Sequence, residues 1–217
     1  MIKRDSSNII VQHSPDPSYS DGGDSSNRTA LMAFIGSITD QKLIHLFVKG
    51  GLGCRHPSQP PYNDPRSWTR DQLIPTIAAL HGTSQAQDLF WGHFKRGFFC
   101  QNSHTIDLAP KPWYQRDILS PSHIGHLIMS AQIYPLYPLL LISWPWLVLD
   151  LLWSTKVKPF EEQNQIICML GTAGVQWLKA YVWLHPDYKK ATRDYWGGWR
   201  DQVEIGEAII KYIEERM

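Results

Sequence analysis

The 217-residue chain has few cysteines and almost no net charge. Its three cysteines, Cys54, Cys100 and Cys168, lie far apart and form neither a Cys-x-x-Cys pair nor an even set for disulfide bonds. This usage indicates a reducing compartment. The 21 basic and 20 acidic residues give a formal net charge of +1, so the chain lacks the broad positive field that attracts polyanions. We therefore expect no nucleic acid as a partner.

Several common sequence signals are missing as well. The first eight residues include basic side chains but no apolar segment follows them, so we predict no secretory signal and interpret the protein as cytoplasmic. The chain has neither a Gly-x-Ser-x-Gly nucleophile elbow nor a glycine-rich phosphate-binding loop. The sequence therefore indicates no cofactor, and it supports neither an elbow-type serine hydrolase nor a P-loop enzyme.

The chain does contain enough apolar residues for a folded core, since 43% are hydrophobic and 10 are tryptophan. Pro15 and Pro17 deny regular structure to residues 1–20, which we predict as an extended lead-in. No change in composition divides residues 21–217, so we predict a single domain there.

Apolar residues recur at helical spacing along most of this domain, and strand signals are scarce. The pattern predicts an all-α fold of seven or eight helices stacked as antiparallel hairpins, with two long ordered loops at 54–68 and 99–119. Thr69, Thr83 or Ser84, and Ser120 ahead of Pro121 are the predicted caps. The predicted helices cover residues 25–48 with a break at 39–40, 69–80, 84–97, 121–128, 133–153, 160–184 and 201–216.

A polar stretch from Asp21 to Thr29 runs directly into apolar residues. Asp21 and Asp24 lie three residues apart around two glycines, and Asp24 or Ser25 is placed to cap the following helix. We favour capping, ahead of an acid–base pair and then a calcium site, because the spacing lacks the terminal Glu of a regular calcium loop.

Trp68-Thr69-Arg70-Asp71 marks another predicted helix start and follows the loop Arg55-His56-Pro57. Similar Trp-Arg-Asp patterns recur near residues 113 and 199. An Asp in a first turn complements the helix dipole and a Trp anchors the next element, so a purely structural interpretation accounts for the pattern.

Two histidines, His123 and His126, share a face of a predicted helix at a spacing that can hold a metal ion. No Glu, Asp or Cys nearby completes the ligand set, so we predict no metal site and favour a helix-start histidine satisfied by a neighbouring loop. Ser122 precedes His123 directly, but adjacent residues on a helix do not face each other.

The most apolar run, from Ile133 to Trp153, contains eight Leu, three Trp and two Tyr residues and only one charge, Asp150. Its length permits a membrane helix. Three prolines divide it, however, and the stretch after Pro138 is only ~15 residues, or ~22 Å as a helix. We favour a buried core helix over a membrane segment through Leu139 to Trp153, with docking in a membrane interface as a third interpretation.

Three motifs carry a family resemblance. Asp-Gly-Gly-Asp-Ser-x-x-Arg-Thr, Arg-His-Pro and Thr-Arg-Asp-Gln-Leu, together covering roughly residues 20 to 130, resemble an uncharacterised family encoded by tailed bacteriophages and prophages. The resemblance implies no activity. Acids at the starts of stacked helices are also similar to those of α/α-toroid carbohydrate-active enzymes, which implies a partial toroid-like fold because a complete toroid needs a longer chain.

If helix N-termini gather on one side, residues 21–28, 55–71 and 117–126 form a polar rim. We hypothesise that this rim binds or cleaves a saccharide or other polar ligand. The alternative is a non-enzymatic phage accessory or structural protein that associates with a membrane through residues 133–153; the oligomeric state is left open. The candidate residues are Asp24, Asp71 and His123 for catalysis, Arg28, Arg55 and Arg70 for an anionic group, Trp68 and Trp113 for stacking on sugars, and Asp21 and His56 as further ligand contacts.

Overall fold

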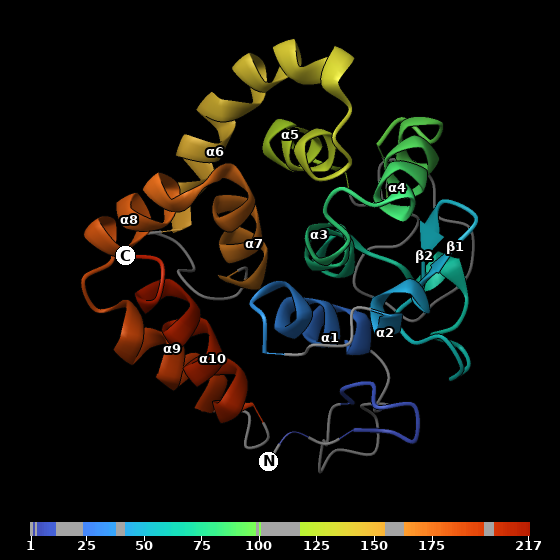
Figure 1. Cartoon of the computed structure of the whole chain (residues 1–217), viewed down its shortest axis with the longest axis horizontal. Helices are drawn as coiled ribbons and strands as arrows, with labels where there is room; N and C mark the ends of the chain where they lie inside the picture. Colours follow the sequence, from blue (N-terminus) through green and yellow to red (C-terminus); the bar gives the residue numbers. More distant parts are fainter. Residues whose placement is uncertain are drawn as a thin grey trace.

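The computed structural model describes residues 2, 4–11, 24–37, 42–98, 100, 118–154, 163–197 and 202–217, and they confirm the predicted all-α class. These residues form ten α-helices, two 3-10 helices and one two-stranded hairpin (Figure 1). The helices are α1 (Ser25–Phe34), α2 (Lys42–His45), α3 (Arg70–Ala79), α4 (Ser84–Phe94), α5 (Pro121–Ser130), α6 (Leu140–Ser154), α7 (Gln163–Ala173), α8 (Val175–Leu184), α9 (Tyr188–Gly197) and α10 (Val203–Glu214); the 3-10 helices are η1 (Pro65–Ser67) and η3 (Tyr134–Leu139).

Helix α3 lies at the centre of the molecule, and α1, α5 and α7 pack around it (Figure 1). Leu31, Ile74, Leu127 and Ile167, one from each of these helices, are fully buried or nearly so. Helix α6 packs on the outer side of α5, and α9 pairs with α10. The four central helices therefore fix the positions of one another's N-termini.

The predicted caps account for where three helices begin. Thr69 forms a capping box with Gln72, Thr83 accepts a hydrogen bond from the Ala86 amide, and Ser120 caps α5. Each cap satisfies backbone amides that have no partner inside the helix. Helix α3 begins at Arg70 and runs through Pro75.

The C-terminal half differs from the prediction in two ways. The single helix expected over residues 160–184 is divided into α7 and α8 at Gly174, whose φ of 122° is strained for any residue with a side chain. Helix α9 was not expected, because the polar segment that starts at Tyr188 has few apolar residues to reveal its buried face.

Backbone glycines also shape the region after α2, where strands β1 (Val48–Lys49) and β2 (Leu52–Gly53) form an antiparallel hairpin. Gly50 and Gly51 occupy its turn with φ of 58° and 76°, as a two-residue hairpin requires. The turn packs against α4 so closely that a Cβ on Gly92 would lie 1.8 Å from the Gly51 carbonyl oxygen.

The first predicted loop is ordered and partly buried, as expected. Tyr62 and Trp68 are 2% and 1% exposed, and a Cβ on Gly53 would overlap the Trp68 ring. The second predicted loop lies almost wholly outside the described residues. The described part of the lead-in is not simply extended, because Ile9 and Ile10 are buried and the Ile10 amide donates to the Thr29 hydroxyl at 3.0 Å.

Candidate functional site

The N-terminal ends of α1, α3, α5 and α7 bring together a chain of polar side chains that are mostly buried, which we call the polar network. Hydrogen bonds join the starts of α1, α3 and α7 to one another, and the start of α5 is joined to α6 through Ser122 and Asp150. That the helix starts form a ligand-binding rim stays a prediction. The network consists of Asp24, Asn27, Arg28, Arg55, Asp71, Gln72, Ser120, Ser122, His123, Asp150, Asn164 and Gln165.

One end of the network is the carboxylate of Asp24. It accepts a hydrogen bond from Arg28 Nη2 at 3.2 Å, lies 3.9 Å from Arg55 Nη1, and is 3.4 Å from Gln72 Nε2. The two arginine side chains are 8% and 9% exposed, whereas that of Asp24 is 39% exposed. Asp24 occupies the N-cap position of α1, but its side chain makes no capping hydrogen bond. The preferred capping interpretation is therefore wrong for Asp24, which pairs with buried guanidinium groups instead.

The middle of the network joins α1, α3 and α7 through side-chain amides. Asn27 Nδ2 donates to the Asp71 carbonyl oxygen at 2.7 Å, and Asn164 Nδ2 donates to Asn27 Oδ1 at 2.6 Å. Gln165 Nε2 donates to Asp71 Oδ1 at 2.6 Å. Asp71 thus receives hydrogen bonds on both its backbone and its side chain, which fixes the first turn of α3 against α7.

The other end of the network is His123, whose side chain is enclosed by α5, α3 and α7. The Ser120 hydroxyl lies 2.6 Å from His123 Nδ1, and the Ser120 amide donates to the same nitrogen at 3.2 Å. Because Nδ1 accepts from an amide, we assign the ring proton to Nε2. Burial lowers the pKa of His123 to about 3, and the charges of Arg70 and His126 act in the same direction. The imidazole is therefore neutral near pH 7.

Ser122 turns away from His123, as expected for adjacent residues. Its hydroxyl donates to Asp150 Oδ2, which links α5 to α6, and it lies 2.7 Å from the Ser120 hydroxyl. The sequence reasoning missed Ser120, Asp150 and Gln165 as members of this site. Only Ser120 carried a local signal, since a cap three residues before a polar side chain is the spacing of a capping box.

The remaining sequence-predicted residues are dispersed. His56 is fully buried and its Nε2 lies 3.1 Å from Asp5 Oδ2, so it anchors the lead-in. Burial lowers the pKa of His56, while Asp5 acts to raise it.

Trp68 is buried, so stacking of its ring on a sugar is wrong for this conformation. Arg70 lies at the network, 3.8 Å from the Asp71 carboxylate, and Asp21 and Trp113 lie outside the described residues.

The predicted histidine pair does not act as a unit. His126 is buried, with its Nε2 3.3 Å from the Ile74 carbonyl oxygen, whereas His123 is bound at the start of the helix. Burial lowers the pKa of His126 to about 4. Within the described ranges, no three His, Cys, Asp or Glu side chains are grouped as metal ligands.

A second feature is the outward side of α6 and the residue before it, which we call the apolar face. Leu140, Ser143, Leu147 and Leu151 recur every three or four residues and are buried against the protein. Only 22% of the Tyr134–Leu152 segment is buried, so the interpretation of this run as a core helix is wrong. Within the described parts of the chain, this segment alone is long and apolar enough to cross a membrane. The apolar face consists of Leu139, Leu141, Ile142, Trp144, Trp146, Val148, Leu149 and Leu152, which are 39–71% exposed.

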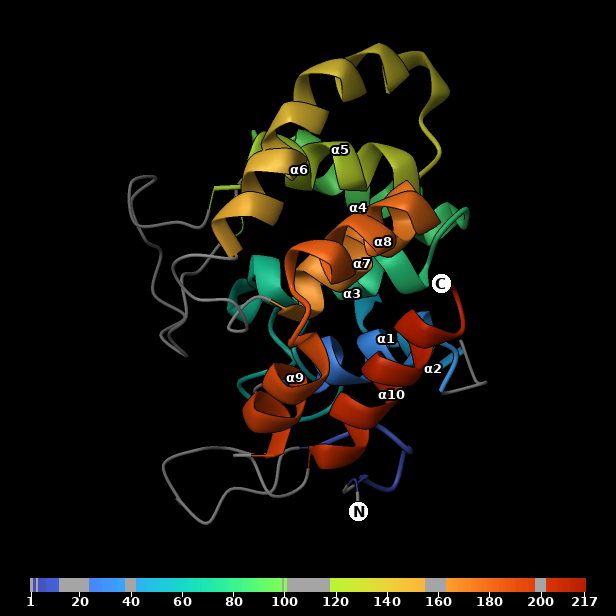
Figure 2. The same ribbon diagram turned by 90° about the vertical axis from the view of Figure 1, so that its left-hand side faces the viewer.

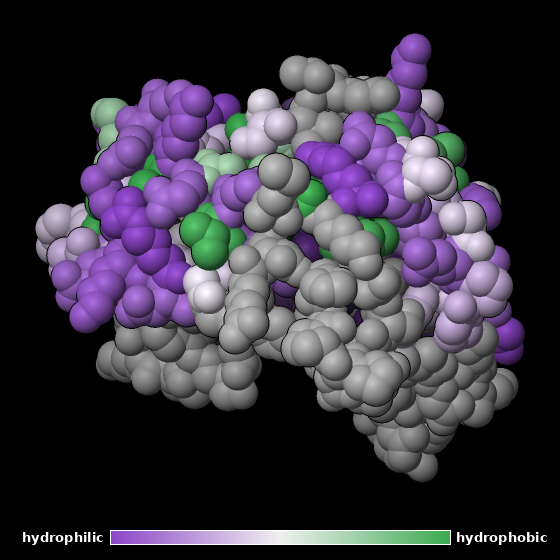
Figure 3. Space-filling model, turned by 90° about the horizontal axis from the view of Figure 1, so that it is seen from below, coloured by the Kyte–Doolittle hydropathy of each residue, from purple (hydrophilic) through white to green (hydrophobic). Residues whose placement is uncertain are grey.

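The apolar face lies on the outside of the molecule. Figures 1 and 2 show α6 running along one edge, with α5 on its inner side. The described surface that is seen from below in Figure 3 is mainly hydrophilic. The two sides of the protein therefore differ in polarity.

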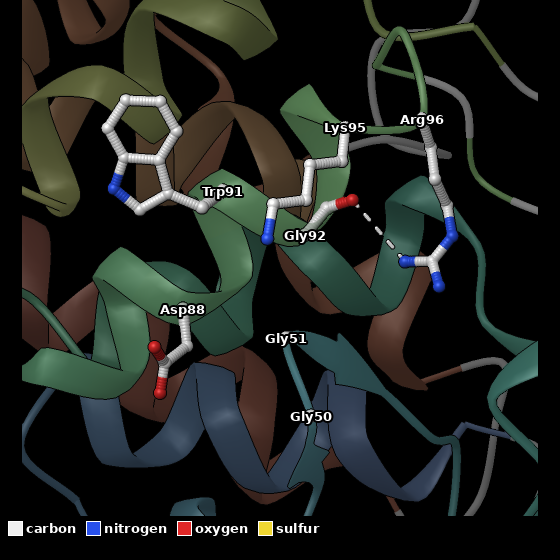
Figure 4. Close-up of a pocket in the computed structure, with 7 residues that line it drawn as sticks. All are labelled: Gly50, Gly51, Asp88, Trp91, Gly92, Lys95 and Arg96. Atoms are coloured by element: carbon white, nitrogen blue, oxygen red, sulfur yellow. Dashed lines mark hydrogen bonds between the residues drawn. The ribbon is translucent and has the colours of Figure 1, made fainter.

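A pocket of about 360 Å³ lies between the β1–β2 turn and α4, away from the polar network (Figure 4). Asp88, Trp91 and Lys95 from α4 and the segment after it, with Arg96, line its polar walls. Arg96 Nη1 donates to the Gly92 carbonyl oxygen at 3.3 Å. Its charged groups are Asp88 on α4 and Lys95 and Arg96 just after that helix.

Comparison with known proteins adds no assignment to this geometry. No protein-family model, curated protein or solved structure is significantly similar to the chain.

Proposed function

We propose that the protein docks on a lipid bilayer through the apolar face of α6. The observation that carries the proposal is the exposure of eight large apolar residues on one side of a single helix. Taking ~150–200 Å² for a fully exposed large side chain, eight such residues at about half exposure present on the order of 700 Å² of apolar surface. The largest apolar patch of a soluble monomer is typically ~300–600 Å².

The helix lies in the membrane interface rather than across the bilayer. Its other side is packed on α5 through Leu147 and Leu151, and its single carboxylate, Asp150, is bound by Ser122. The 15 residues of α6 span ~22 Å, which is less than the ~30 Å hydrocarbon core. Trp144 and Trp146 suit the interface, where an apolar ring with a polar N–H is favoured. A packed inner side and an apolar outer side are what a monotopic helix needs.

Flotation with vesicles tests this proposal. We expect the purified chain to float with vesicles of zwitterionic or mixed anionic lipid and to stay bound in high salt, because the apolar face contains no charged residue. Recovery of all the protein in the vesicle-free fraction, at both low and high salt, would contradict bilayer docking.

A second candidate function is binding or cleavage of a polar ligand, with saccharides as the proposed class, at the polar network. Its support is that Asp24 pairs with Arg28 and Arg55, and that Asp71 and His123 both have Gln165 as a neighbour. Asp24 and Asp71 are the exposed carboxylates of that set, at 39% and 27%, so direct contact with ligand hydroxyl groups falls to them. Arginines beside them suit an anionic substituent.

A panel of oligosaccharides tests this second function, with binding measured by calorimetry and cleavage by product analysis. Asp24→Asn and Asp71→Asn should each weaken binding or activity, whereas Asp194→Asn, at an exposed position of α9, serves as the matched control. Equal affinity and activity in all three variants would remove Asp24 and Asp71 from the site.

A further inference from the structure

We propose that Ser120 is a nucleophile activated by His123, so that the polar network is a site for acyl transfer from ester substrates. This inference is independent of bilayer docking. Its starting point is the 2.6 Å distance between the Ser120 hydroxyl oxygen and His123 Nδ1. Because Nδ1 is the unprotonated nitrogen, the hydroxyl donates to it, which is the contact needed to remove the serine proton.

The surroundings place the hydroxyl in front of its base. Ser120 is partly exposed, whereas His123 is 5% exposed. The neighbouring Ser122 hydroxyl donates its own proton to Asp150, so its oxygen, 2.7 Å from that of Ser120, is a second acceptor for the Ser120 proton beside Nδ1. A substrate can therefore reach Ser120 while the imidazole stays shielded from water.

Gln165 lies beside the base. Gln165 is 1% exposed and its amide group donates to Asp71 at 2.6 Å, which holds the side chain in one orientation. Gln165 acts to raise the pKa of His123, yet within the described residues its buried Oε1 makes no hydrogen bond of standard geometry. Gln165 Oε1 can accept a stronger hydrogen bond from the Nε2 proton once the imidazole becomes positively charged. An amide that orients a catalytic histidine is a known arrangement.

A capping box by itself does not require this arrangement. The box accounts for the contacts between Ser120 and His123, but it requires neither the burial of the ring nor the hydrogen bond from Gln165 to Asp71. A second pair in this protein shows the contrast: Ser58 lies 3.4 Å from His56 Nδ1, which already accepts from the amides of Ser58 and Gln59. Ser58 is therefore a turn residue and a natural control.

The chemical step balances without a further reactant except water. Ser120 Oγ attacks the ester carbonyl carbon while its proton moves to His123 Nδ1, and the alkoxide leaves with that proton as an alcohol. Water then gives a proton to Nδ1 and attacks the acyl-serine, and the proton returns to Ser120 as the carboxylic acid is released.

A fluorophosphonate probe, which loses fluoride when a serine oxygen attacks its phosphorus, tests the inference by peptide mass mapping. We expect label on Ser120 of the wild-type chain and of Ser58→Ala, and no label at position 120 in Ser120→Asn. Asparagine caps a helix as well as serine does, so that variant keeps α5 intact. His123→Ala should slow labelling by ~10²–10⁴-fold, the usual contribution of a general base.

Two results would overturn the inference. One is a folded wild-type protein, with its helical circular dichroism intact, in which Ser120 stays unlabelled or only Ser58 reacts. The other is labelling of Ser120 at the same rate in wild type and His123→Ala. Vesicle flotation of the same preparations separates this result from bilayer docking, because none of the three substitutions lies on the apolar face.

Discussion

Replacing two outward residues of α6 with glutamine should abolish most of the bilayer affinity. Ile142 and Leu149 are 62% and 54% exposed, so each has about half of its side chain available for contact with lipid. Full burial of such a side chain contributes ~1.5–3 kcal/mol, so half of it gives ~1 kcal/mol per residue. With the cost of placing a polar amide in the interface, we expect the double variant to lose ~2–3 kcal/mol, or ~30- to 150-fold in partition coefficient.

The measurement is a vesicle titration followed by flotation, with wild type and Ile142→Gln/Leu149→Gln compared at equal lipid. Val203→Gln on α10 is the matched control, because Val203 is an apolar residue with 48% exposure on a different helix. Both positions are exposed, so the free energy of unfolding should change by no more than ~0.5 kcal/mol per substitution. Equal partition of the double variant and wild type would refute the role of the apolar face. A dimer that buries the apolar face, detected by light scattering, would refute it as well.

Other predictions concern stability. Burial lowers the pKa of His123 to about 3 and of His93 and His126 to about 4, below the unfolded value of 6.5, so the folded state resists their protonation. Stability is therefore full above pH 6.5 and falls below it, by about 4 kcal/mol per pH unit for the three together; an unchanged urea midpoint between pH 7 and 5 would contradict this. Gly92→Ala should destabilise by ~1–3 kcal/mol because its Cβ meets the hairpin turn, whereas Gly197→Ala, with open space around it, should not. Thermal unfolding compares the two glycine variants.

Local chemistry accounts for the parts of the fold that were predicted. Thr69, Thr83 and Ser120 cap helices because a hydroxyl group can satisfy amides a few residues away, and that preference is encoded next to the helix it starts. The division at Gly174 was missed because a glycine that follows a helical pattern stops it only when tertiary packing favours the left-handed backbone. The family resemblance to phage proteins stays a prediction.

The candidate site was predicted in part for the same reason. Asp24, Asp71 and His123 are recognisable because each stands at a helix start. Their partners Gln165 and Asp150 belong to helices far along the chain, and no sequence pattern relates them to α3 or α5. Trp68 has the composition of a ligand-stacking residue, but the loop around it folds inward.

The sequence by itself determined the helical class, the capped starts of α3, α4 and α5, and the presence of one long apolar run, because caps, periodicity and hydropathy act over a few residues. Only the tertiary structure decided which side chains of that run are buried and which are exposed. Hydropathy counts apolar side chains without saying what covers them, and in the folded chain α5 covers one side of α6 and leaves the rest exposed. Likewise, the start of α5 with Ser120 and His123 lies beside Gln165 of α7 only because α5 and α7 pack against the same central helix.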